Sequence, residues 1–447
     1  MTDWKKGITD FAKRLDAKID EQRGKLQQGG ERTLRIEAYR GFGRADRAWV
    51  KARVLRGTPI APARAGDSVW INLSAMLQRF ESDEVAGARV RIRYPGGEQV
   101  VTTDREGYCE CWIEPSPPAV ADGAWHSVEL ELLEPPSPHP VRTTAKVLIP
   151  PGNARFGVIS DLDDTVVRTD VASRVRMAKH VFLGNAHTRT PFPGVAAFYR
   201  ALEHGADGKQ SNPVFYVSSS PWNLFDVLAE FLELKGIPAG PLLLRDWGIA
   251  STDPGEGGHL GHKLRHIRII LEMFPTLPFI LIGDSGQEDP EIYHRAVVEH
   301  PERILAVYIR NVSRAPERVG AIRALAAEVE KAGSTLILAD DTAAAAVHAS
   351  ESGWISAAAL AEVGAVATAE QAPPTEALKQ TNEELSAGDV PPPEALEQVN
   401  EELSTGDVPP PEAATGGVGT GGTGTGGAGA RGAGTGEVGR GEVGTGG

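Results

Sequence analysis

Cysteine, methionine and long apolar runs are scarce in this 447-residue sequence, which has two cysteines and four methionines. Cys109 and Cys111 stand two positions apart in a strand-like run. That spacing suits neither a disulfide framework nor a zinc site, and it favours a reducing compartment. No apolar run approaches the roughly 20 residues that span a bilayer, and residues 1–30 contain no apolar signal core. We therefore expect a cytoplasmic protein.

Positive charge is also in short supply, because the formal net charge is −14. Residues 373–447 hold 12 acidic and 3 basic side chains, a net −9, so the rest of the chain is only mildly acidic. A nucleic-acid partner calls for a basic face, which nothing in this distribution indicates. We expect no nucleic-acid partner.

Residues 1–30 are predicted to form an amphipathic N-terminal helix. Trp4, Ile8 and Phe11 recur at steps of three and four residues, with lysines beside them. Such a face docks on the rest of the protein or on a second subunit, or it lies in a membrane interface as a peripheral anchor. The anchor would place the protein at the inner membrane surface, although acidic residues among the lysines weaken that interpretation. Both stay open.

Residues 31–151 alternate apolar and polar side chains with period two, as in 89–94 and 128–132. Pro95-Gly96-Gly97 is a hairpin signal between two such runs. Seven or so short strands of this kind predict an all-β sandwich-like domain. The segment holds no catalytic cluster, so we interpret it as a structural or docking module.

Residues 152–360 alternate apolar strands with helical segments, which predicts an α/β fold with a parallel sheet flanked by helices. The predicted strands are 156–160, 214–217, 241–244, 278–282, 304–309 and 335–338, and the helices are 195–204, 222–235, 263–274, 289–300 and 317–332. Residues 361–447 are predicted to be a disordered low-complexity tail. In it, segment 377–385 recurs as 395–403, an 18-residue repeat, before a Gly-rich end.

The strongest chemical signal is the run 156–165, an apolar strand that leads into Asp161 and Asp163. Open parallel sheets place their ligands at this carboxyl edge. One carboxylate of such a pair attacks phosphorus and carries the phosphoryl group. The other protonates the leaving alkoxide and then activates water. Crowded anions facing an anionic substrate require a cation, and Mg²⁺ is the oxygen-binding ion of phosphoryl transfer. An Asp-rich turn that only caps a helix is the competing interpretation.

Further parts of such a site follow in order along the chain. The strand 214–217 ends in Ser218 and Ser219, whose hydroxyl and backbone N–H groups suit a phosphate oxygen, although a plain helix cap is also common there. Lys263 opens a helix and is suited to neutralise a phosphoryl group, with Lys235 as a competing lysine.

A second apolar strand, 278–282, also runs into acidic residues. It is followed by Gly283-Asp284, with Asp289 or its neighbour Glu288 suited to complete the oxygen shell of a metal. Zinc is a weaker interpretation, because the three nearby histidines have no cysteine beside them and Lys263 in their midst. These histidines are His259, His262 and His266.

The order of these segments resembles the four motifs of haloacid dehalogenase (HAD) superfamily phosphatases. More narrowly, DLDDTVVRT at 161–169, PFPGV at 191–195, YVSSSPW at 216–222 and GDSGQEDPEIY at 283–293 are similar to the catalytic domain of the actin-patch type of phosphatidate phosphatase, which has bacterial relatives. The resemblance covers about residues 155–312. It implies a HAD-like Rossmannoid parallel sheet with flanking helices, Mg²⁺ as cofactor and hydrolysis of phosphatidate to diacylglycerol and phosphate.

The resemblance also implies a role for each motif residue. Asp161 would be the nucleophile and Asp163 the acid/base. Ser218 would bind a phosphoryl oxygen, and Lys263 would stabilise its charge. The remaining assignments are Asp161, Asp163 (through its carbonyl group), Asp284 and Asp289 for Mg²⁺, and Thr165, Arg168 and Ser219 for substrate.

The spacing of the motifs leaves no room for a large cap domain, because only about 25 residues separate Thr165 from Pro191. We infer an open site, which suits a substrate presented on a surface, such as phosphatidate in a membrane. Two alternatives stay open. One is a HAD phosphatase acting on a soluble phosphomonoester or a phosphoprotein. The other is a non-catalytic adaptor, against which the intact Asp161 and Asp163 pair argues.

Overall fold

The computed structural model describes residues 33–57, 83–116, 118, 123–167, 190–245 and 259–371. The predicted N-terminal helix, Arg168 and the low-complexity tail beyond residue 371 lie outside the described residues. Within the described part of the chain, no helix has the length and apolar character needed to cross a membrane.

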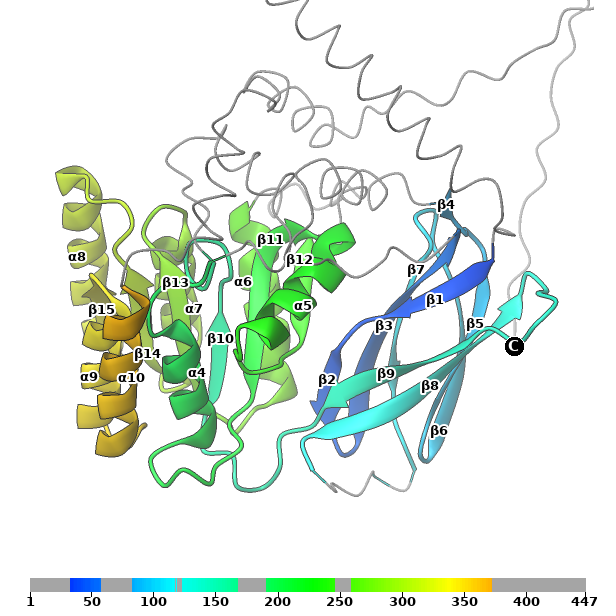
Figure 1. The fold of residues 1–447 in the computed structure, drawn as a ribbon, viewed down its shortest axis with the longest axis horizontal. Helices are drawn as coiled ribbons and strands as arrows, with labels where there is room; N and C mark the ends of the chain where they lie inside the picture. The colour runs from blue at the N-terminus through cyan, green and yellow to red at the C-terminus, as the bar shows by residue number, and fades with distance from the viewer. Residues whose placement is uncertain are drawn as a thin grey trace, which may run out of the picture. The chain divides into compact units, whose positions relative to one another are not determined.

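The N-terminal described region is all-β, as predicted, with nine strands in one hydrogen-bonded sheet (Figure 1). Alternation explains its interior: in β8, Val128 and Leu130 are buried, whereas Glu129 faces outward. The predicted hairpin is present, since Tyr94 pairs with Gly97 across a turn in which Gly96 has a φ of 81°. The strands are β1 (Leu34–Ala38), β2 (Gly41–Arg44), β3 (Arg47–Arg56), β4 (Asp83–Glu84), β5 (Arg89–Tyr94), β6 (Gly97–Thr102), β7 (Tyr108–Ile113), β8 (Trp125–Glu134) and β9 (Arg142–Leu148).

One long strand connects the pairing of this region. The strand order is β1-β3-β2-β9-β8-β5-β6, with β4 and β7 both paired to β3. Because the ten-residue strand β3 pairs with β1, β2, β4 and β7, the hydrogen bonding is continuous through all nine strands. Buried side chains from β3, β5, β8 and β9 meet in one core.

The second region is a mixed α/β fold whose six strands are all parallel, and each predicted strand is present. The strands are β10 (Gly157–Ser160), β11 (Val214–Pro221), β12 (Leu242–Arg245), β13 (Phe279–Asp284), β14 (Ile304–Arg310) and β15 (Leu336–Ala339). The helices are α4 (Val195–His204), α5 (Phe225–Leu234) after the short 3₁₀ helix η1 (Trp222–Leu224), α6 (His259–Met273), α7 (Asp289–Glu299), α8 (Pro316–Lys331), α9 (Thr342–Glu351) and α10 (Ala357–Glu370).

The strand order β12-β11-β10-β13-β14-β15 positions the site. The chain moves outward from β10 in one direction to β11 and β12, and then crosses back to place β13 on the other side of β10. Helices α4, α9 and α10 contact one another on one face of the sheet, and α6, α7 and α8 on the other (Figure 1). Between β10 and β13 the connections diverge, and open α/β sheets bind ligands at the carboxyl ends of the strands at such a point.

Helix α10 crosses the domain boundary expected at residue 360. Val363 and Ala367 on this helix are buried, and the Glu370 carboxylate accepts a hydrogen bond from the backbone N–H of Gly194 at 2.8 Å. The ordered α/β region therefore extends to Glu370. Alanine makes up half of α9 and half of α10, so their sequences have little of the periodicity from which helices are predicted.

Candidate functional site

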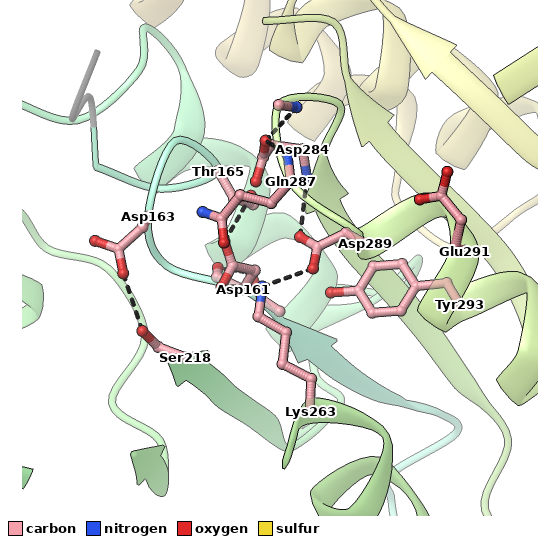
Figure 2. Close-up of polar contacts among 12 residues, drawn as sticks. Asp161, Asp163, Thr165, Ser218, Lys263, Asp284, Gln287, Asp289, Glu291 and Tyr293 are labelled. Atoms are coloured by element: carbon pink, nitrogen blue, oxygen red, sulfur yellow. Dashed lines mark hydrogen bonds and ion pairs between the residues drawn. The ribbon is translucent and has the colours of Figure 1, made fainter. Parts of the chain in front are cut away.

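The residues predicted for catalysis and metal binding meet at the carboxyl edge of the parallel sheet (Figure 2). Asp161 directly follows β10, Ser218 lies in β11, and Asp284 is the last residue of β13. Helices supply the rest, because Lys263 lies in the first turns of α6 and Asp289 is the first residue of α7. Residues that are up to 128 positions apart in sequence thus share one edge, as parallel packing of the strands requires.

Lys263 joins two of the aspartates. Its ammonium nitrogen Nζ lies 2.8 Å from Oδ1 of Asp161 and 2.6 Å from Oδ1 of Asp289. All three side chains are at most 2% exposed, so the contacts lie out of reach of solvent screening. Of the two lysines considered, Lys263 is the one that contacts Asp161, whereas Lys235 lies at the C-terminal end of α5.

Asp284 is held by the loop that follows it. Its Oδ1 accepts hydrogen bonds from the backbone N–H groups of Gly286, at 2.6 Å, and Gln287, at 3.1 Å. Its Oδ2 is buried and has no hydrogen-bond partner among the described residues. One oxygen each from Asp161, Asp284 and Asp289 lies within 4.8 Å of the others. This arrangement favours Asp289 over Glu288, whose side chain is exposed.

The charges of this cluster do not balance. Three buried carboxylates face the single ammonium group of Lys263, which leaves a formal excess of two negative charges. Burial raises the pKa of Asp161 well above its usual value; Lys263 opposes this, and the charges of Asp289 and Asp284 add to it. Burial and the charge of Asp289 likewise raise the pKa of Asp284 to about 7. Burial would lower the pKa of Lys263, but the two contacting aspartates outweigh it and raise that pKa.

Asp163 is directed away from this cluster, toward β11 (Figure 2). The strand β10 ends at Ser160, and the chain then turns through Asp164, whose φ is 55°. Oδ2 of Asp163 accepts hydrogen bonds from the hydroxyl groups of Ser218, at 3.0 Å, and Ser220, at 2.9 Å. The two aspartates of the first motif therefore have different surroundings, which is what a division of labour between them requires.

The predicted substrate residues are only partly together. The Thr165 hydroxyl donates to Oδ2 of Asp161 at 3.3 Å, so Thr165 lies at the site. The Ser219 hydroxyl is buried and has no hydrogen-bond partner among the described residues. In the described part of α6, the rings of His262 and His266 are 4.4 Å apart. Burial lowers their pKa values to about 3 and about 4. The one possible metal cluster among the described residues is the aspartate group, which argues against the zinc interpretation.

Two residues of the site were missed from the sequence. Ser220 has no sequence signal of its own, because Ser218 at the same strand end already accounts for the expected phosphate-binding hydroxyl group. Arg318 of α8 donates to the carbonyl group of Ser285 at 2.8 Å, to that of Gln287 and to the carboxylate of Glu291. It thereby holds the loop that presents Asp284. An arginine in an amphipathic helix has no local signal that distinguishes it from a solvated one.

Gly283 offers a test of how tightly the site is packed. A Cβ atom there would lie 2.5 Å from Oδ2 of Asp289 and 2.7 Å from Cε2 of Tyr293. We expect Gly283→Ala to destabilise the protein by about 1–3 kcal/mol, the usual cost of overpacking, in urea unfolding. Gly320→Ala is the control, because a Cβ in that part of α8 meets no atom within 4 Å and should add up to about 1 kcal/mol of stability. Equal effects of the two changes would contradict the packing described.

Comparison with known proteins gives one family match. Residues 156–311 match the family described as "Phosphatidate phosphatase APP1, catalytic domain". The chain is 35% identical to phosphatidate phosphatase APP1 of Saccharomyces cerevisiae over 156 residues, which are 35% of this chain and 26% of the yeast protein. It is 30% identical to an uncharacterised protein of Schizosaccharomyces pombe over 162 residues, 35% of this chain and 25% of that protein. The chain thus spans about a quarter of the length of these relatives.

Solved structures add little to this. A β-glucuronidase from Parabacteroides merdae aligns with 68% of this chain and 39% of its own, at 9% identity and a TM-score of 0.21. A similarity this low carries no argument about fold or function.

Proposed function

We propose that this chain, whose residues 156–311 match the catalytic domain family of phosphatidate phosphatase APP1, is a Mg²⁺-dependent phosphatidate phosphatase. It would use a HAD-type fold and an aspartyl-phosphate intermediate. The observation that carries the proposal is the pair of aspartates in the first motif. Asp161 is buried against Lys263 beside two more carboxylates, and Asp163 is held separately by two serine hydroxyls.

The aspartate cluster fits Mg²⁺. The donor set is oxygen only, Oδ2 of Asp284 is buried without a hydrogen-bond partner among the described residues, and the formal charge excess is two. Asp161, Asp284 and Asp289 would hold the ion, together with the carbonyl group of Asp163. When bound, Mg²⁺ would screen the carboxylates from the anionic substrate and lower the barrier to phosphoryl transfer by charge neutralisation.

Asp161 is suited to be the nucleophile. Its carboxylate would form a bond to phosphorus while the bond from phosphorus to the glycerol oxygen breaks. Lys263, whose pKa is raised by the contacting aspartates, stays charged and holds one oxygen of Asp161 in place. Positioning and electrostatic stabilisation are the main sources of rate in phosphoryl transfer, and this pair supplies both.

Asp163 is suited to move the protons. Its carboxyl group would give a proton to the departing alkoxide of diacylglycerol. The resulting carboxylate would then take a proton from a water molecule, whose oxygen attacks phosphorus and releases phosphate from Asp161. Ser218 stands beside Asp163, where its hydroxyl group would donate to a phosphoryl oxygen bound at the same strand end.

The substrate proposal has separate support. The matched yeast protein is named as a phosphatidate phosphatase, and the short connection between the first motif and Pro191 predicts an open site. Contact of residues 1–28 with a membrane surface remains a prediction, as does action on a soluble phosphomonoester.

Phosphate release from phosphatidate tests the function directly. With phosphatidate in mixed micelles, we expect release that requires Mg²⁺ and stops when the ion is chelated by EDTA. Asp289→Asn should raise the Mg²⁺ concentration for half-maximal activity by about 10- to 100-fold, because the ion loses a charged oxygen ligand. Glu288→Gln is the matched control and should leave it unchanged, since this neighbouring side chain is exposed. Release at full rate in EDTA would refute the metal proposal.

A further inference from the structure

Ser220 is the second serine that donates a hydrogen bond to Asp163, and the four motifs assign it no role. The pairing of β11 with β10 ends at Tyr216, and its pairing with β12 shifts between Val217 and Pro221. The last residues of β11 are therefore released from the regular ladder beside the loop that carries Asp163. Ser218 and Ser220 are two apart and face the same side, whereas Ser219 between them faces away.

Both hydroxyl groups bind the same atom, Oδ2 of Asp163, at 3.0 Å from Ser218 and 2.9 Å from Ser220. The backbone N–H of Ser220 also donates to the Ser218 hydroxyl oxygen at 3.0 Å. Two hydroxyl donors thus hold Asp163 through one of its carboxyl oxygens. Its other carboxyl oxygen is the one suited to hold the proton that moves.

Ser218 cannot serve Asp163 and the substrate together. A serine hydroxyl has one hydrogen, and in the structure Ser218 gives it to Asp163. Under the proposed function Ser218 must donate that hydrogen to a phosphoryl oxygen, so Asp163 loses one of its two donors when substrate binds. Ser220 is the donor that remains.

We propose that Ser220 is the positioning residue of the acid/base Asp163, which it keeps oriented toward the leaving group and then toward water while Ser218 is engaged by the phosphoryl group. The inference rests on the proposed function and goes beyond it. Ser220 touches neither phosphorus nor the leaving oxygen. In the first step the bond from Asp161 to phosphorus forms while the phosphorus–alkoxide bond breaks, and the alkoxide takes the proton of Asp163. In the second step the oxygen of water bonds to phosphorus while the bond to Asp161 breaks, and Asp163 takes a proton from that water.

The leaving group distinguishes this role from a structural one. The alkoxide of diacylglycerol needs a proton to depart, whereas nitrophenolate is a stable anion that departs without one. For a two-step phosphatase, kcat/KM reports only the steps up to loss of the alcohol. Poor orientation of Asp163 should therefore lower kcat/KM for phosphatidate and spare kcat/KM for p-nitrophenyl phosphate.

Ser220→Ala should lower kcat/KM for phosphatidate on the order of 10- to 100-fold, the range expected when a general acid is misplaced. Its kcat/KM for p-nitrophenyl phosphate should stay within about threefold of wild type, with a burst of nitrophenolate because attack of water on the phosphoenzyme is slowed. Ser220→Thr, which keeps the hydroxyl group, should restore phosphatidate turnover. Ser218→Ala should reduce kcat/KM for both substrates, because it loses a contact with the phosphoryl group itself.

An equal loss on both substrates in Ser220→Ala would overturn the positioning role, and so would an unchanged kcat/KM for phosphatidate. In either case a wild-type enzyme active on phosphatidate leaves the proposed function standing. A wild-type protein that hydrolyses neither substrate in Mg²⁺ would overturn both proposals. Thermal unfolding of each variant identifies a loss of activity that comes only from unfolding.

Discussion

Asp161→Asn should abolish phosphate release from phosphatidate, by about 10⁴-fold or more, because an amide cannot attack phosphorus or carry the phosphoryl group. The same change should leave stability within about 1 kcal/mol of wild type. Burial and the neighbouring carboxylates already raise the pKa of Asp161, so a neutral side chain of the same shape relieves repulsion. Lys263 keeps its second partner, Asp289. Activity is measured as released phosphate, and stability by urea unfolding without Mg²⁺.

A phosphoenzyme measurement makes this prediction specific. Acid quenching of wild type with labelled substrate should trap phosphate on the protein, and Asp161→Asn should trap none. Glu288→Gln is the control, as an exposed acidic residue at the start of α7. Full activity in Asp161→Asn would refute the nucleophile assignment, although another group would then have to carry the phosphoryl transfer.

Lys263→Met should give the largest loss of stability. The change removes the ammonium group that lies 2.8 Å from Asp161 and 2.6 Å from Asp289, and it leaves both carboxylates buried without it. Removing one partner of a buried ion pair costs about 3–5 kcal/mol. We expect a loss of this size in urea unfolding in EDTA, where no bound cation replaces the missing charge. Activity should fall as well, since nothing else on α6 would hold Asp161.

Two further variants test that explanation. Arg268→Met changes another cation of α6, whose ion pair with Glu299 is partly exposed, so its cost should be no more than about 1 kcal/mol. Adding Asp289→Asn to Lys263→Met should recover part of the lost stability, because one uncompensated charge is gone. If Lys263→Met cost no more than Arg268→Met, the ion pairs of Lys263 would not be what stabilises the site.

The all-β region shows where pattern reasoning stops. Alternation in β8 correctly predicted which side chains face the core, because in a strand that depends only on neighbouring residues. The alternation does not predict which strands pair with one another. The pairing of β3 with β1, β2, β4 and β7 joins segments before and after it in the chain, and no local pattern indicates it.

Local sequence features predict that apolar parallel strands lead into Asp161, Ser218 and Asp284, since strand length, apolar character and the residues that follow are all local. Parallel packing then brings those ends to one edge. Which side chains contact one another within the site is not a local property. Glu288 and Asp289 are adjacent in sequence, but in a helix neighbours point about 100° apart, so the phase of α7 alone decides which one reaches Lys263.

The same reason applies to the other contacts of the site, which depend on tertiary packing. Lys263 contacts Asp161 because α6 begins beside that residue. Lys235 lies instead at the end of α5. The bond from Ser220 to Asp163 joins residues 57 positions apart, and it depends on where β11 leaves its ladder. The chain therefore encodes its chemistry locally, while the orientation of each acid is a property of packing between distant segments.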